Sequence, residues 1–169
     1  MNKELQLLTN INENEQISQR QLAKAMDLSL GTINGLISNM IQLGYIIIEQ
    51  SQSKKTKYFL TTLGQHEKAK RQYQLIVDSY HIISKTRNGI IRVIENQLQK
   101  GINIFYIYGE EDEISKLAKM SLIELKREHA IKYEHTTDIS NVKSTSSSCI
   151  LYWNTNFMPD KAVNAVMIL

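Results

Sequence analysis

The stretch from Ile17 to Ile46 constrains the fold of this 169-residue chain most strongly, because it predicts two short helices around a tight turn and then a strand. Ser18 is placed to cap the first helix, and Gln21, three residues later, can complete a capping box. Ser29 is in the same way a candidate N-cap of the second helix. Gly44 is expected to end that helix, because glycine adopts the left-handed backbone that helix C-termini often need.

Apolar residues recur at helical spacing in both predicted helices, which are joined by a turn at Asp27-Leu28. In the first helix Leu22, Ala23 and Met26 share one face. We therefore expect a helix-turn-helix with one buried side. The buried stripe predicted for the second helix is Ile33, Leu36, Ile37, Met40 and Ile41.

The other face of the second helix is small and polar and has no acidic residue. A helix that enters the major groove of DNA needs such a face, because short side chains allow close approach, and amides and hydroxyls bond base edges. Asn34 and Asn39 can each form two hydrogen bonds with adenine, and Thr32 can touch a thymine methyl. The alternative is the solvated face of an ordinary helix hairpin. The candidate DNA-binding residues here are Ser29, Leu30, Gly31, Thr32, Asn34, Gly35, Ser38 and Asn39.

A strand, a basic tip and a second strand follow, which is the order of a wing. The segment from Tyr45 to Glu49 is β-branched and typical of a strand. Residues 58–60, Tyr-Phe-Leu, return as the second strand. The tip supplies three more candidate DNA-binding residues, Lys54, Lys55 and Lys57.

Together these segments resemble the winged helix-turn-helix regulators of the MarR type. The matching pieces are ISQRQLAKAMDLS, LGTINGLISNMIQLGYI and YFLTTLG, the last similar to the family's leucine-threonine-x-x-glycine signature. The resemblance covers roughly the first seventy residues, and its combined spacing is more specific than any single piece. It implies double-stranded DNA as the partner. The wing tip lacks the aspartate–arginine pair common in that family, and Gly35 stands where an arginine is frequent, so readout of guanine by arginine is not implied.

The composition predicts a soluble cytoplasmic protein. Hydrophobic residues make up 42% and charged residues 22% of the chain, as in ordinary globular proteins. No apolar run approaches the roughly 20 residues of a membrane helix, and acids and amides stand near the N-terminus where a signal peptide would be apolar. The single cysteine, Cys149, argues against a disulfide framework or a cysteine-based zinc site. We expect a buried structural thiol rather than a redox switch.

The net charge of +3 is unevenly distributed. Residues 1–100 carry 13 Lys/Arg and 8 Asp/Glu, whereas residues 101–169 carry 7 and 9. Much of the positive charge lies between Lys54 and Arg71. Such a cluster suits DNA phosphates, because neutralising them releases counterions, although a solvated surface has the same composition. Since the excess is modest, we expect useful affinity only if two copies bind together.

A long helix is expected to begin at Thr61 or Thr62 and to reach about Ser84, with a break at residues 86–89 before a second helix. Its apolar residues are spaced alternately three and four apart, as in a coiled coil. This stripe either packs on its own domain or meets its copy in a homodimer, which would match two half-sites one DNA turn apart. The candidate dimerisation residues are Tyr73, Ile76, Tyr80 and Ile83.

The C-terminal third changes to strand-like patterns. Residues 102–108 are almost continuously apolar, as in a buried parallel strand. A helix from Asp112 to about Arg127 and three further strands, at residues 131–135, 149–153 and 164–169, complete a β-α-β unit with a right-handed crossover and a small α/β domain. This part resembles, more faintly, the small Rossmann-like sensor domains of some winged-helix regulators.

The junction after the first of these strands does not fit a dinucleotide site. Residues 110–113 are four acids where the fingerprint needs glycines, and carboxylates repel a pyrophosphate. Acids at a helix N-terminus instead complement the helix dipole. The four histidines lack zinc-ligand spacing, and the serines at 146–148 lack the glycines of a nucleophile elbow. We therefore predict no cofactor, no metal site, no catalytic residue and no enzyme activity.

The sequence thus predicts an α+β protein of three segments. These are a winged helix-turn-helix in residues 1–62, connecting and dimerisation helices in residues 63–100, and a Rossmann-like sensor or assembly domain with a mostly parallel sheet in residues 101–169. The predicted function is DNA-binding transcription regulation, in which the helix from Leu30 to Leu43 enters the major groove. The C-terminal domain is expected either to sense an unknown small-molecule or protein effector or to build the assembly. The alternative is a winged-helix adaptor, in which Leu30 and Leu36 contact a protein partner.

Overall fold

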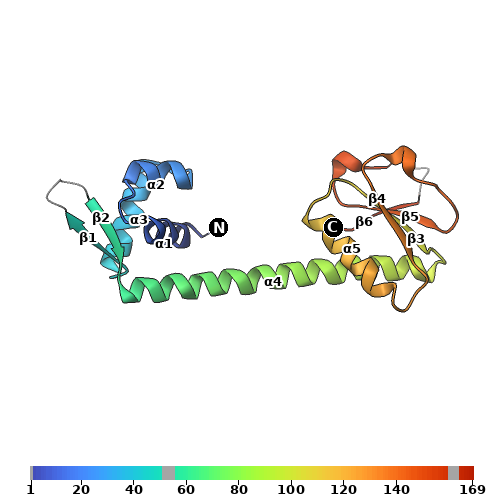
Figure 1. The fold of residues 1–169 in the computed structure, drawn as a ribbon, viewed down its shortest axis with the longest axis horizontal. Coiled ribbons are helices and arrows are strands. Elements are labelled where there is room, and N and C mark those ends of the chain that lie inside the picture. Colours follow the sequence, from blue (N-terminus) through green and yellow to red (C-terminus); the bar gives the residue numbers. More distant parts are fainter. Residues whose placement is uncertain (1, 51–55, 160–163) are drawn as a thin grey trace. The chain divides into compact units, whose positions relative to one another are not determined.

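The computed structural model describes residues 2–50, 56–159 and 164–169 (Figure 1). The chain divides into two compact units, Met1–Ser79 and Tyr80–Leu169. The boundary falls within helix α4 (Thr62–Gln99), so each unit contains part of that helix. No helix of the described residues is long and apolar enough to cross a membrane.

Unit 1, Met1–Ser79, contains a winged helix-turn-helix, as predicted. Strands β1 and β2 pair antiparallel, from Ile46 opposite Leu60 to Gln50 opposite Thr56. In chain order its elements are α1 (Lys3–Glu13), α2 (Gln19–Met26), α3 (Leu30–Gln42), β1 (Ile46–Gln50), β2 (Thr56–Leu60) and the first part of α4.

The core of unit 1 contains most of the predicted apolar stripes. Leu22 of α2 and Ile33 and Met40 of α3 have no exposed surface. Ile41 was predicted in the same stripe, but 36% of it is exposed. Successive helical residues point about 100° apart, so Ile41 lies at the edge of the stripe that Met40 centres. Helix α1 packs against the same core, in which its residue Ile11 is fully buried.

Unit 2, Tyr80–Leu169, contains a four-stranded sheet in the order β4-β3-β5-β6. Every neighbouring pair in it is parallel, which confirms the predicted mostly parallel sheet. Its elements after α4 are β3 (Ile104–Tyr108), α5 (Glu113–Leu125), β4 (Lys132–Thr136), the 3₁₀ turn η1 (Ile139–Asn141), β5 (Ser148–Tyr152), the 3₁₀ turn η2 (Thr155–Phe157) and β6 (Ala165–Met167).

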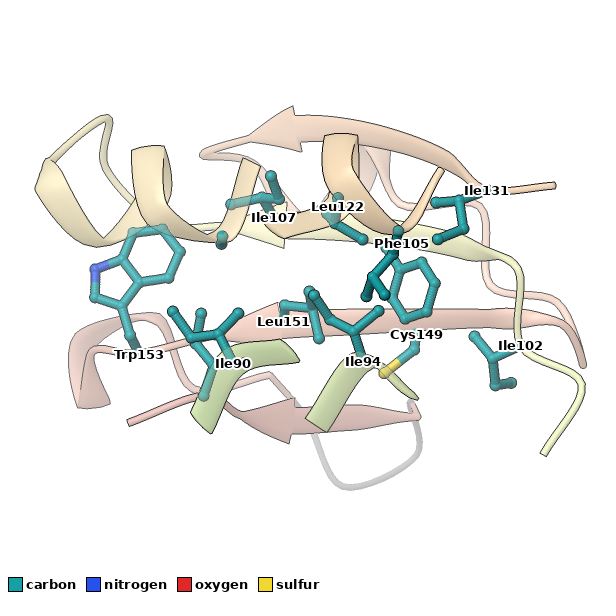
Figure 2. Packing of buried hydrophobic residues seen from close by; sticks show 13 residues of the cluster. Ile90, Ile94, Ile102, Phe105, Ile107, Leu122, Ile131, Cys149, Leu151 and Trp153 are labelled. Atoms are coloured by element: carbon teal, nitrogen blue, oxygen red, sulfur yellow. The ribbon is translucent and has the colours of Figure 1, made fainter. Parts of the chain in front are cut away.

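The core of unit 2 lies between one face of the sheet and two helices (Figure 2). Alternate strand residues point to one face, so Phe105 and Ile107 of β3 share a side. Helices α4 and α5 both pack against that side. The central side chains of this cluster are Ile90, Ile94, Phe105, Ile107, Leu122, Cys149, Leu151 and Trp153.

Helix α4 is one continuous helix of 38 residues, so the predicted break at residues 86–89 is wrong. A glycine costs a helix interior only about 1 kcal/mol relative to alanine. Tertiary contacts on both sides of Gly89 offset that cost. Arg87 forms an ion pair with Glu124 of α5, and Ile90 is fully buried in the unit 2 core.

Candidate nucleic-acid interface

Helix α2 begins at the predicted capping box. The backbone N–H of Gln21 donates to Ser18 Oγ at 3.2 Å, and the backbone N–H of Ser18 donates to Gln21 Oε1 at 2.8 Å. Asp27 then takes a left-handed conformation, with φ of 52°, and ends the helix. These local contacts fix the turn that leads into α3.

Helix α3 has the predicted cap at each end. Ser29 Oγ accepts from the backbone N–H of Thr32 at 3.1 Å. At the other end Gly44 has φ of 72°, and the N–H of Tyr45 donates to the carbonyl of Met40 at 2.9 Å. This is a Schellman motif, which satisfies carbonyls that the helix leaves unpaired.

The polar face predicted on α3 is open to solvent, opposite the stripe that faces the core. Leu30, its largest apolar member, is 42% exposed. We call this set the α3 polar face, and all eight members are exposed: Ser29, Leu30, Gly31, Thr32, Asn34, Gly35, Ser38 and Asn39. They are available to a partner, and their contact with DNA stays a prediction.

Two glycines lie on the α3 polar face without a structural need for glycine. A Cβ atom at Gly35 would meet nothing within 4 Å, and one at Gly31 would lie 3.9 Å from Ser29 Oγ, an ordinary contact. Neither glycine has a left-handed backbone. The fold of unit 1 therefore does not explain why these positions are glycine.

The structure describes one of the three lysines predicted in the wing. Lys57 lies on β2, partly exposed, opposite Glu49 of β1. Lys54 and Lys55 lie outside the described residues. The described part of the wing thus carries one cation with an acidic residue opposite it in the strand register.

A cleft of about 650 Å³ lies between the wing and the two helices. Gln19 and Arg20 of α2, Leu30 of α3 and Thr56 and Tyr58 of β2 line it. Arg20 is exposed, and sequence reasoning did not include it in the interface. The sequence feature that could have indicated Arg20 is its position as a basic residue in the first turn of α2.

The predicted dimerisation stripe of α4 is exposed. Tyr73 and Ile76 of unit 1 are 68% and 63% exposed. Tyr80 and Ile83 of unit 2 are 67% and 49% exposed. Large apolar side chains in such a row are unusual on a helix that faces only water. Their role in dimerisation stays a prediction.

In unit 2 the loop after β3 is filled by the chain's own side chains. A Cβ atom on Gly109 would lie 2.8 Å from the ring of Trp153, so only glycine fits. Asp112 Oδ1 accepts from the N–H groups of Ile114 and Ser115 at 2.9 Å, and its Oδ2 accepts from Trp153 Nε1 at 2.8 Å. The first N–H groups of α5 are thereby occupied at the place where nucleotide-binding folds hold phosphate.

These contacts set the charge state of Asp112. Partial burial alone would raise the pKa of this carboxyl, but the hydrogen bonds from Ser115, Trp153 and Ile114 outweigh it and lower the pKa. Asp112 therefore remains ionised as a cap of α5, as the sequence predicted for acids at this helix N-terminus.

Potential metal ligands and the cysteine thiol are two other kinds of reactive group in the part of the chain that the structure describes. Within residues 2–50, 56–159 and 164–169, no group of three or more His, Cys, Asp or Glu could hold a metal ion. Cys149 is buried in the core, and burial raises the pKa of its thiol to about 11. A thiol in this state is a weak nucleophile at neutral pH.

Comparison with known proteins supports the reading of the N-terminal part. Residues 2–47 match a family model described as winged helix-turn-helix DNA-binding. This segment is a winged helix-turn-helix. The match covers fewer than half of the residues, so it does not assign the whole chain to a family.

A solved structure, a MarR family transcriptional regulator from Silicibacter pomeroyi DSS, is similar at 17% identity. The match covers 58% of this chain and 69% of that chain, with a TM-score of 0.43. That score is too low to carry an argument. No curated protein matches the chain.

Proposed function

We propose that this protein is a transcription regulator that binds duplex DNA through the α3 polar face and acts as a homodimer. The observation that carries the proposal is the exposed, acid-free polar face on the second helix of a winged helix-turn-helix. Such a helix enters the major groove, where its polar side chains meet base edges. A regulator of this kind acts on DNA in the cytoplasm.

The open glycines of α3 support DNA as the partner. Glycine in a helix interior costs about 1 kcal/mol relative to alanine, and nothing in unit 1 requires it at Gly35. Close approach of another backbone is a common reason for glycine. A phosphate backbone beside Gly31 and Gly35 would supply that reason.

The homodimer is supported by the α4 stripe and by charge. Tyr73 and Ile76 expose large apolar surfaces that a second copy of α4 would cover. Unit 1 has 9 Lys/Arg and 7 Asp/Glu, too small an excess for strong binding by one copy. Two copies would double the phosphate contacts and match a pair of half-sites.

Unit 2 would then sense an effector or build the assembly. The crevice beyond the carboxyl ends of β3 and β5 is the usual ligand site of such a sheet. Here Trp153 packs on Gly109 within it. An effector, a small molecule or a protein, would therefore bind elsewhere on unit 2 or displace the indole.

The proposal is tested by selecting duplexes from a random pool with the purified chain and measuring affinity for the selected duplex at several salt concentrations. Replacing one phosphate-contacting lysine should reduce the slope of log affinity against log salt by about one. We expect this for Lys57→Ala. The control is Lys119→Ala, an exposed lysine on α5, which should leave the slope unchanged.

The adaptor alternative has one specific observation in its favour, the 42% exposure of Leu30 at the start of α3. An adaptor would enrich no duplex sequence, even at low salt. That result would overturn the regulator and leave Leu30 as a contact for a protein partner.

A further inference from the structure

Thr61 joins the end of α3 to the start of α4 within unit 1. Its Oγ1 donates to the carbonyl of Gly44 at 2.7 Å and accepts from the backbone N–H of Gly64 at 3.0 Å. Its own backbone N–H donates to the carbonyl of Tyr45 at 3.0 Å. One hydroxyl thus links the backbone after α3 to the first turn of α4.

Gly64 allows the two segments to come this close. A Cβ atom on Gly64 would lie 2.0 Å from the carbonyl oxygen of Tyr45 and 2.9 Å from its carbon. These are backbone atoms that cannot move aside, because Tyr45 leads directly into β1. Any larger residue at position 64 would push α4 away from the end of α3.

We propose that Thr61 is a positioning residue for DNA recognition. It fixes the direction of α4 relative to α3, and thereby the orientation of the α3 polar face relative to Tyr73 and Ile76. In a dimer joined through those side chains, this direction sets the distance between the two recognition helices. The inference rests on the proposed function, since it assumes that α3 reads DNA and that α4 joins the copies.

We expect unit 1 to remain folded when the hydroxyl of Thr61 is removed. Helix α4 is held a second time by Arg71, which pairs with Glu4 of α1 and with Glu67 one turn earlier. Thr61→Val keeps the shape of the side chain but leaves the Gly44 carbonyl and the Gly64 N–H without their partner. Thr61→Ser keeps the hydroxyl and is the matched control.

The first measurement needs no DNA. Spin labels on Ser38→Cys of α3 and Lys70→Cys of α4, both exposed positions, report the distance between the two helices. The buried Cys149 thiol, with its pKa raised to about 11, stays unlabelled at neutral pH. Dilution with unlabelled protein removes the contribution of label pairs that lie on two different copies of the chain.

We expect one narrow distance distribution in the parent chain and in Thr61→Ser, and a broadened one in Thr61→Val. A Thr61→Val distribution as narrow as the parent's overturns the inference. Because this readout is independent of DNA, it decides the role of Thr61 in fixing α4 even if the chain binds no duplex, a result that would overturn the proposed function instead.

The second measurement uses duplexes whose two half-sites are moved apart one base pair at a time. The parent chain and Thr61→Ser should prefer one spacing. Thr61→Val should lose about fivefold in affinity at that spacing, the equivalent of one neutral hydrogen bond, and should bind a single half-site unchanged. A spacing preference that survives in Thr61→Val would contradict a role in positioning.

Discussion

At the scale of single residues, a substitution at Gly35 should change protein stability and DNA binding in opposite directions. Gly35→Ala should raise the free energy of unfolding by up to about 1 kcal/mol, because alanine is the better helix former and a Cβ meets nothing there. If DNA approaches this position, the same methyl group should weaken duplex binding several-fold. Denaturant unfolding and duplex titration measure the two effects.

Gly89→Ala is the matched control for Gly35→Ala. Gly89 is also helical, exposed and free of neighbours within 4 Å of a Cβ, but it lies in unit 2. This variant should be stabilised to a similar extent and should bind duplex DNA as the parent chain does. Equal DNA affinity in both variants would remove the close-approach argument for Gly35.

Residue patterns that act over three or four positions were predictable from sequence. The capping box of Ser18 and Gln21 and the left-handed Gly44 are local, and both are confirmed. The hydrogen bond from Trp153 to Asp112 joins positions 41 residues apart, and no local pattern indicates it. The contact of Gly64 with Tyr45 was not predictable from sequence either, although Gly64 is the glycine of the leucine-threonine-x-x-glycine signature.

At the scale of elements, the α4 stripe predicts the oligomeric state. Tyr80→Glu places a charge in the stripe and should shift a dimer to monomers, because burying an unpaired carboxylate is costly. The helix itself should persist, since Tyr80 is 67% exposed within one chain. Sedimentation velocity measures the mass, and circular dichroism measures the helix content.

Asn96→Glu introduces the same side chain at an exposed position of α4 outside the stripe. It should leave the mass unchanged. A parent chain that sediments as a monomer, or a Tyr80→Glu variant that remains a dimer, would contradict dimerisation through this stripe.

The capped start of α5 predicts a pH dependence of unit 2. The pKa of Asp112 is lower in the folded chain than its ordinary value of 3.8, so the unfolded chain takes up the proton first as the pH falls. The stabilisation by ionised Asp112 is complete at a pH above its ordinary pKa, and it is lost as the pH falls through the lower pKa of the folded chain.

Asp112→Asn should therefore destabilise unit 2 at neutral pH. The difference in the free energy of unfolding between this variant and the parent chain should become smaller in acid. Trp153, the single tryptophan of the chain, reports unfolding by fluorescence. A constant difference between the two proteins from neutral to acid pH would show that the charge of Asp112 does not stabilise α5.

Element types were predicted better than element ends. Winged helix, long helix and parallel sheet follow from apolar periodicity, and all are present. The continuity of α4 was not predictable, because Thr86, Asn88 and Gly89 are poor helix formers by local propensity. The burial of Ile90 and the pairing of Arg87 with Glu124 reverse that preference, and both depend on tertiary structure.

At the scale of the whole molecule, the net positive charge of each unit is small. The structure divides the chain after Ser79, and at that boundary unit 1 has a surplus of two basic residues and unit 2 of one. A boundary at residue 100 gives a larger charge difference between the two parts, because the cations of residues 80–100 then belong to the N-terminal part. The proposed specific binding would therefore depend on the paired contacts of two copies rather than on a strongly basic surface.

The most direct test of the central claim is the affinity of the full chain for its selected duplex and for a scrambled duplex over a range of salt. We predict tighter binding to the selected duplex at every salt concentration, and affinity for both that falls linearly on a log–log scale as salt rises. Equal affinity for the two duplexes, or no binding at low salt, would contradict recognition of duplex DNA by the α3 polar face.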